Sequence, residues 1–122
     1  MQPIRVLIVD DTPEVRLLLK GLLERANFQV WTAEDGPSAL HRFREMRPGL
    51  VILDIWMPGM NGIEVARRIR QSSSVPILLL SAVGTPDLVA QAREAGVDAF
   101  LTKPVSPRAL LTTIFELTHH NR

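Results

Sequence analysis

The chain of 122 residues contains no cysteine, which excludes disulfides, thiol nucleophiles and cysteine-ligated metal sites. It also lacks an apolar run long enough for a membrane-spanning helix, and its amino terminus lacks the pattern of a secretory signal. We therefore expect no membrane insertion and a soluble protein of the cytoplasm.

Histidine, lysine and excess charge are also scarce. Two of the three histidines, His119 and His120, lie in the tail, so no histidine is available for catalysis at the predicted strand ends. The net charge of +1 is too small to indicate direct nucleic-acid binding. Without repeats or linkers, a chain of this length is expected to form one domain spanning residues 1–122.

Continuous apolar runs at residues 5–9, 50–53 and 76–80 indicate strands. They lack the alternation of half-exposed antiparallel strands, so we expect parallel strands that are buried on both faces. Residues 28–33 alternate more and are expected at a sheet edge. The predicted strands are residues 4–9, 28–33, 49–54, 76–80 and 99–102.

Segments with helical periodicity lie between these strands. The first has its expected core face formed by Val15, Leu18, Leu19, Leu22 and Ala26. Leu17 points nearly opposite to that face. The predicted helices are residues 13–26, 36–47, 61–73, 86–96 and 107–119.

Start and stop signals support these helices. Thr12, Thr85 and Ser106 each precede a proline, which is the order of an N-cap followed by the first helical residue. Gly96 is a typical residue for the end of the fourth helix. Five strand–helix units with right-handed crossovers predict an α/β fold with a doubly wound, five-stranded parallel sheet.

Polar residues suited to phosphate or metal chemistry lie at the ends of four predicted strands: Asp10 and Asp11, Asp54, Ser81, and Lys103. The carboxyl ends of parallel strands share one sheet edge, where open α/β sheets bind ligands. Three carboxylates at about 4 Å would repel one another, with each pair costing roughly 4 kcal/mol at a dielectric of 20. Raised carboxyl pKa values are therefore expected in the metal-free site. Oxygen-rich sites of this kind suit Mg²⁺.

Each of these residues also has a structural interpretation. Asp11 with Glu14 matches a capping box, and Asp54 alone is typical of a turn or cap. Ser81 alone is more often a loop hydroxyl, and Lys103 alone a solvated surface charge. These separate interpretations do not explain why all the residues converge on one predicted edge. Lys103 is notable because Lys20 is the only other lysine in an arginine-rich chain.

Four motifs resemble the receiver domain of two-component response regulators. They are Val9-Asp10-Asp11, the run from Leu53 to Gly62, Ser81-Ala82, and Leu101-Thr102-Lys103-Pro104. Each motif alone is weak, but the set spans nearly the whole chain in the family's order. The resemblance implies the flavodoxin-like sheet order 2-1-3-4-5 and a cis bond before Pro104.

The resemblance also implies roles for individual residues. Asp54 would accept a phosphoryl group from the phosphohistidine of a sensor histidine kinase or a histidine phosphotransfer protein. Asp10, Asp11 and Asp54 would hold Mg²⁺ together with the backbone carbonyl of Trp56. The protein would act as a signalling phosphoacceptor that catalyses only its own phosphorylation and dephosphorylation, not as an enzyme for a separate substrate.

Two further side chains would act around the phosphoryl group, since in the family Ser81 and Lys103 correspond to groups that contact its oxygens. Phe100 takes the place of the aromatic switch residue. Phosphorylation would then alter the surface of the fourth helix, fifth strand and fifth helix. The signal would be read by either a downstream protein or an effector domain that follows Arg122.

Three other interpretations were compared with this one. A haloacid-dehalogenase-like phosphatase would need a D-x-D pattern after the first strand, where the chain has Asp10-Asp11-Thr12. A flavodoxin-like FMN carrier would need a phosphate-binding loop there, and the two aspartates would repel that phosphate. A degenerate receiver that only binds proteins would not be expected to retain Asp54, Ser81 and Lys103.

Overall fold

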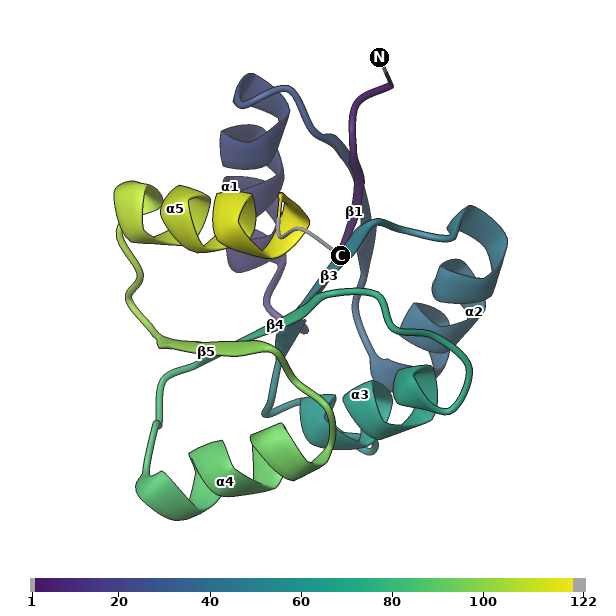
Figure 1. Ribbon diagram of the computed structural model, residues 1–122, viewed down its shortest axis with the longest axis vertical. Coiled ribbons are helices and arrows are strands. Elements are labelled where there is room, and N and C mark those ends of the chain that lie inside the picture. Colours follow the sequence, from purple (N-terminus) through teal and green to yellow (C-terminus); the bar gives the residue numbers. More distant parts are fainter. Residues whose placement is uncertain (1, 120–122) are drawn as a thin grey trace.

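The computed structural model describes residues 2–119 as five strands that alternate with five helices (Figure 1). The ends of the predicted domain 1–122, with His120, lie outside these residues. The elements are β1 (Arg5–Val9), α1 (Pro13–Arg25), β2 (Gln29–Ala33), α2 (Gly36–Met46), β3 (Leu50–Asp54), α3 (Gly62–Arg70), β4 (Ile77–Ser81), α4 (Pro86–Glu94), β5 (Ala99–Thr102) and α5 (Pro107–Thr118).

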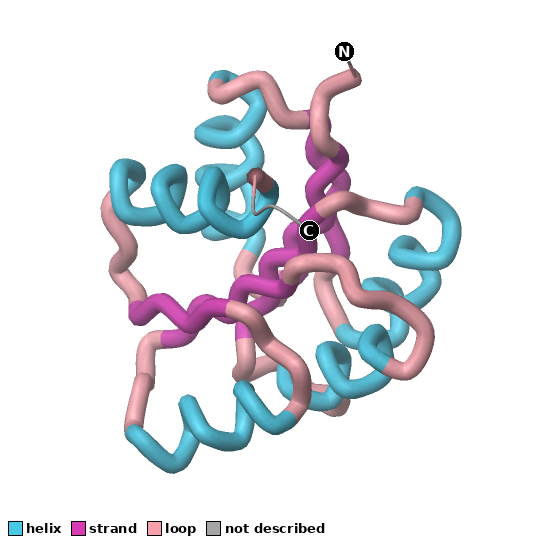
Figure 2. Tube along the Cα trace, viewed as in Figure 1, coloured by secondary structure: helices cyan, strands magenta, loops and turns pink. Residues whose placement is uncertain are grey.

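All the strands are parallel and form one sheet in the order β2-β1-β3-β4-β5, which confirms the predicted flavodoxin-like topology. Figure 2 shows the sheet as the magenta layer at the centre of the molecule. β3 and β4 are fully buried, as their continuous apolar runs predict. β2 is half-buried and lies at an edge, also as predicted.

The helices cover both faces of the sheet. One core layer joins alternate strand residues, including Ile8 and Leu78, to Leu19 and Leu23 of α1 and Leu110 of α5. The other layer joins the remaining strand residues to α2, α3 and α4. In Figure 1, α1 and α5 accordingly lie on one side of the sheet and the other three helices on the opposite side.

The local signals place the helix starts correctly. α1, α4 and α5 begin at the prolines that follow Thr12, Thr85 and Ser106, and the last two N-caps accept backbone hydrogen bonds. Because the N-cap of α1 is Thr12, the capping-box interpretation of Asp11 is wrong. Gly96 has φ +98°, the left-handed conformation typical of a residue that follows a helix.

The predicted core face of α1 is partly wrong. Leu18 is 69% exposed, and Ala26 is also exposed. Leu19 and Leu23, one helical turn apart, are the buried contacts with the sheet. Leu18 is rotated about 100° from Leu19 and borders a groove between α1 and the start of α5. Leu17 is exposed as predicted, with 73% of its surface accessible.

Two boundaries differ from prediction in informative ways. α3 ends at Arg70, three residues early, before an irregular segment that leads to β4. β4 extends one residue further than predicted, so Ser81 is its last residue. Among residues 2–119, no helix combines the length and apolar character needed to span a membrane.

Candidate functional site

The carboxyl edge of the sheet brings together all the predicted side chains. Asp10 and Asp11 follow β1, Asp54 ends β3, Ser81 ends β4 and Lys103 follows β5. Carboxylate oxygens of the three aspartates all lie within 4.8 Å of one another. Residues separated by more than 90 positions in the chain thus form one polar site because parallel strands end side by side.

Asp10 is held rigidly at the end of β1. It is only 2% exposed, and its backbone N–H donates to the Ala33 carbonyl of the neighbouring strand at 3.2 Å. Its Oδ1 accepts a hydrogen bond from the Thr12 N–H at 2.9 Å. Its backbone carbonyl accepts a 2.6 Å bond from Arg16, which sequence reasoning missed because no motif marks that contact. Asp10 therefore has one carboxylate oxygen committed to the backbone and the other directed into the site.

Asp54 is 8% exposed and lies where β3 meets the start of α3. That close approach requires Gly62, because a Cβ at this position would lie 2.1 Å from the Asp54 carbonyl oxygen. The Gly62 N–H also donates to the Ile55 carbonyl at 2.8 Å. In the segment between Asp54 and Gly62, Trp56 is 55% exposed beside the site, while Ile55 is buried. The loop thus presents Trp56 to solvent and anchors its own backbone through Ile55 and Gly62.

Ser81 and Lys103 are positioned by the pairing of β4 and β5. The Lys103 N–H donates to the Ser81 carbonyl at 2.8 Å, and a cis peptide bond follows between Lys103 and Pro104, as predicted. The Lys103 ammonium lies 2.9 Å from Asp10 Oδ2 and 3.5 Å from Asp54 Oδ1. The buried Ser81 hydroxyl accepts a 3.2 Å bond from the Val83 N–H. Ser81 therefore ends the strand next to Asp54, and Lys103 reaches Asp54 from β5, one strand further along the sheet.

The electrostatics agree with the expected repulsion. Burial, followed by the nearby charge of Asp10, raises the pKa of Asp54 above its ordinary value, although Lys103 partly offsets this. Burial alone would lower the pKa of Lys103, but its hydrogen bond and charge interactions with the two aspartates raise it overall. The site thus keeps its ammonium charged and disfavours a full set of ionised carboxylates without a further cation.

The donor set fits a hard divalent cation. Three carboxylates converge, and one of them, Asp11, is exposed to solvent. Mg²⁺ prefers oxygen ligands and retains several waters, so a half-open cluster suits it. The pKa of Asp54 is raised first by burial and then by the charge of Asp10, and a bound cation would favour the ionised form of Asp54.

Phe100, the predicted switch aromatic, is half-buried on β5 and packs against the core layer that contains α4. The loop between β4 and α4 lies against β5 at Phe100 and Thr102. A Cβ on Gly84 would be 2.6 Å from Thr102 Cγ2 and 3.4 Å from Phe100 Cε1. The loop that follows Ser81 is therefore in close contact with the Phe100 ring.

The fold and this acidic edge define a flavodoxin-like α/β domain with a site built on three aspartates. The model of the family described as the response regulator receiver domain matches residues 6–115. The chain belongs to this family, whose general function is phosphoryl transfer in two-component signalling.

Curated relatives and solved structures agree with this assignment. The chain is 40% identical over 110 residues to the transcriptional regulatory protein ResD of Bacillus subtilis, covering 90% of this chain and 46% of that protein. It is equally identical over the same length to the DNA-binding response regulator MtrA of Mycolicibacterium smegmatis, covering 90% of this chain and 48% of that protein. The chain thus spans about half the length of these curated relatives.

Among solved structures, the chain resembles the chemotaxis protein CheY4 of Vibrio cholerae, with a TM-score of 0.91 and 32% identity, covering 94% of this chain and 98% of that one. It also resembles the BeF3-activated receiver domain of RstA from Klebsiella pneumoniae, with a TM-score of 0.91 and 27% identity, covering 95% of this chain and 99% of that one. Membership in this family argues against the phosphatase and FMN-carrier interpretations.

Proposed function

We propose that Asp54 accepts a phosphoryl group from the phosphohistidine of a sensor histidine kinase or a histidine phosphotransfer protein. The observation that carries the proposal is the convergence of Asp10, Asp11, Asp54, Ser81 and Lys103 on one sheet edge. An Asp54 carboxylate oxygen would form a bond to phosphorus while the nitrogen–phosphorus bond of the donor breaks, and the electron pair would remain on the imidazole nitrogen. The product would be an acyl phosphate on Asp54.

The other side chains would position the group and balance its charge. Asp10, Asp11 and Asp54, with the backbone carbonyl of Trp56, would hold Mg²⁺, which supplies charge neutralisation and orientation when bound. Lys103 and the Ser81 hydroxyl would contact the phosphoryl oxygens. Such positioning and electrostatics dominate phosphoryl transfer, where the protein performs little other covalent chemistry.

The same geometry suggests how the signal leaves the site. The Ser81 oxygen accepts a hydrogen bond from the Val83 N–H, and a phosphoryl group on Asp54 would give the Ser81 O–H an anionic acceptor of its own. Movement of that hydroxyl would pull on the β4–α4 loop, which lies against Phe100. We therefore place the responsive surface on α4, β5 and α5, where a downstream protein or an effector domain would read it. Under this proposal the protein is a cytoplasmic signalling domain with no separate substrate, and the domain extends over residues 1–122.

Labelling with a small phosphodonor tests the proposal. Acetyl phosphate with Mg²⁺ should add one phosphoryl group, measured by intact-protein mass. Asp54→Asn and chelation by EDTA should each abolish the addition. Asp87→Asn, on the exposed first turn of α4, is the matched control and should label like the parent protein. Continued stoichiometric labelling of Asp54→Asn would overturn the assignment.

A further inference from the structure

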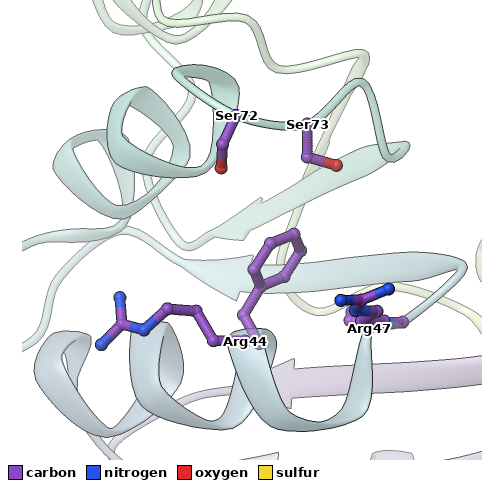
Figure 3. Close-up of a pocket in the computed structure, with 6 residues that line it drawn as sticks. Arg44, Arg47, Ser72 and Ser73 are labelled. Atoms are coloured by element: carbon purple, nitrogen blue, oxygen red, sulfur yellow. The ribbon is translucent and has the colours of Figure 1, made fainter.

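A second hollow lies at the opposite edge of the sheet, where α2 and α3 end and their neighbouring strands begin. Its volume is about 550 Å³, within the range of roughly 300–1,000 Å³ that is usual for ligand pockets. The lining residues come from the end of α2 and from the segment after α3: Phe43, Arg44, Arg47, Pro48, Ser72 and Ser73 (Figure 3).

Two guanidinium groups border this hollow without carboxylate partners. Within residues 2–119, neither Arg44 nor Arg47 forms a salt bridge or donates a side-chain hydrogen bond. In Figure 3 their side chains lie on the α2 side of the hollow and extend in different directions, with Ser72 and Ser73 across from them. Arginine presents a planar set of donors that matches a carboxylate, so each group is suited to a separate acidic side chain.

The wall opposite these arginines is held in place by a third one. Arg70 donates to the Ser73 and Val75 carbonyls at 3.2 and 2.7 Å and pairs with Asp98 at 2.7 Å. The Ser73 hydroxyl accepts a bond from the Val75 N–H at 3.1 Å. The segment that carries Ser73 is therefore ordered before any ligand arrives, which lowers the entropic cost of binding.

Arg47 has a backbone conformation that ordinarily favours glycine. It follows α2 with φ 47°, in the left-handed region, where a side chain costs roughly 1–2 kcal/mol. Its N–H donates to the Phe43 carbonyl at 3.0 Å, and its own carbonyl accepts from Arg5 at 3.2 Å. Its side chain also borders an adjacent hollow of about 420 Å³ that Arg5 lines. Arg47 thus borders both hollows, and the larger one, with Arg44 and Arg47 at its rim, is called the basic groove below.

The segment that supplies the lining of this groove is rich in arginine although the whole chain carries only +1. Residues 36–73 contain six arginines and three carboxylates, Glu45, Asp54 and Glu64, and one of the arginines, Arg70, is paired with Asp98. The arginines are Arg42, Arg44, Arg47, Arg67, Arg68 and Arg70. The aspartates of the phosphoacceptor site gather at the other sheet edge, so an acidic partner would be attracted here and repelled there.

We propose that this groove binds an extended acidic segment of a partner protein. One carboxylate would pair with Arg44 and another with Arg47, while an apolar side chain between them would pack against Phe43 and Pro48. Because the groove and Asp54 lie at opposite ends of the sheet, the segment would bind with or without phosphorylation. The groove would therefore act as a constitutive anchor for a partner, separate from the phosphorylation-dependent surface.

A peptide fits these observations better than a nucleic acid does. Phosphate backbones are recognised by rows of cations along an extended surface, and their affinity depends on many such contacts. Here a defined hollow with half-buried Phe43 and buried Pro48 lies between two guanidinium groups. A mixed lining of two apolar residues with a few charged and polar groups suits a short peptide that carries both acidic and apolar side chains.

Fluorescence anisotropy with a labelled peptide of two glutamates, one leucine and two glutamates tests the proposal at low salt. Arg44→Gln and Arg47→Gly should each weaken binding by about tenfold or more, since charge-assisted hydrogen bonds are lost. Arg47→Gly is a sharp variant because glycine relieves the left-handed backbone, so Tm should hold or rise while binding falls. Arg67→Gln, exposed on α3 outside the lining, is the matched control and should bind like the parent.

Several results would overturn the proposal. They are undetectable binding to the parent protein, unchanged binding to the double variant of Arg44 and Arg47, or an equal loss with Arg67→Gln. A peptide with glycine in place of leucine should bind more weakly, and equal affinity would remove the role of Phe43 and Pro48. If a short DNA duplex binds more tightly than the peptide, and both variants weaken it equally, the ligand of the groove is nucleic acid and not an acidic peptide. Beryllofluoride is an analogue of the phosphoryl group, so a peptide affinity that changes when it is added would contradict a constitutive anchor.

Discussion

The ammonium of Lys103 lies closer to Asp10 than to Asp54, at 2.9 Å from the first carboxylate and 3.5 Å from the second. One ammonium therefore bridges two carboxylates whose strands are adjacent in the sheet. Under the proposed function, Lys103 would turn from Asp10 toward the phosphoryl oxygens on Asp54. Lys103 lies in the site and Lys20, the other lysine, does not, so substitution of Lys20 is the control for substitution of Lys103.

Lys103→Ala should slow acetyl phosphate labelling on the order of 100-fold, the effect of removing one placed electrostatic donor from a reacting group. Mg²⁺ binding, measured by titration calorimetry, should remain because the three aspartates are intact. The metal-free protein should lose roughly 1–3 kcal/mol of stability, since two buried carboxylates lose their cation.

Lys20→Ala is the control for that prediction. Lys20 forms an exposed pair with Glu24 on α1 at 2.8 Å, and such pairs contribute little to stability. Labelling and Tm should stay close to those of the parent protein. If Lys103→Ala labels at the parent rate, Lys103 has no role in the transfer.

The elements themselves were readable from the sequence because each carries a local signal. Continuous apolar runs gave the buried strands, and a cap followed by proline gave the starts of α1, α4 and α5. The exposure of Leu18 was not readable, because Leu18 belongs to the apolar stripe but is turned away from the sheet to the border of the groove between α1 and α5. Periodicity alone cannot distinguish the centre of an apolar stripe, which faces the sheet, from its solvent-exposed margin.

The candidate site was predicted in the same way, but only as a set of residue types at strand ends. The sequence motifs indicated Asp10, Asp54 and Lys103, and parallel topology implied their proximity. The bond from Arg16 to the Asp10 carbonyl could not be predicted, since no pattern marks it. The groove at Arg47 was also missed, because a left-handed arginine has no sequence signature of the kind that glycine provides.

Asp54→Asn should stabilise the Mg²⁺-free protein at neutral pH. Burial and Asp10 raise the pKa of Asp54 in the folded state, so ionising this group opposes folding. The folded state binds the proton more tightly than the unfolded one, and the resulting stability is lost as pH rises through the folded pKa. Each kcal/mol relieved by asparagine corresponds to roughly 4 °C in Tm for a domain of this size.

The pH dependence checks the cause of that stabilisation. The difference in Tm between Asp54→Asn and the parent should be largest at neutral pH and should shrink as pH falls toward the ordinary aspartate pKa of 3.8. Mg²⁺ should raise the Tm of the parent by more than that of the variant, since the variant lacks one proposed ligand. A difference that stays constant across this pH range would mean that charge at Asp54 is not its origin.

The exposed apolar side of α1 offers a test of donor docking. Leu17 is 73% exposed, and Leu18 borders the groove that also contains Lys103 and Pro104. In the family, the histidine-bearing partner helix docks against the first helix near the site. Leu17→Lys and Leu18→Lys should each slow transfer from a phosphohistidine donor by about fivefold or more, as expected for losing an interface contact worth over 1 kcal/mol.

Acetyl phosphate labelling of the same variants separates docking from damage, because this donor needs no protein contact. It should be unchanged in both. Phe115→Lys, which replaces a 60% exposed side chain on α5, should affect neither donor. Equal losses with both donors would indicate a folding defect, and no loss with either would exclude this side of α1 from the contact.

The lifetime of the proposed acyl phosphate depends on whether water can approach the phosphorus from behind. Trp56 is two residues beyond Asp54 and 55% exposed, and Val83 is two residues beyond Ser81 and 45% exposed. In the family, side chains at these places flank the path of the attacking water. An indole and an isopropyl group cannot accept a proton from that water, and their apolar surfaces should exclude it. Slow loss of phosphate is therefore expected relative to receivers with polar side chains there.

Replacing Trp56 by asparagine and Val83 by glutamate should speed that loss by about tenfold or more. This is less than the roughly 100-fold or more that a well-positioned general base contributes. The decay is followed by intact-protein mass at fixed Mg²⁺ after the phosphodonor is removed. Phe115→Glu, which places the same new charge on an exposed apolar position of α5, is the control and should keep the parent lifetime. A lifetime that stays the same or lengthens in the double variant would show that the apolar side chains do not protect the acyl phosphate, and that access is limited elsewhere.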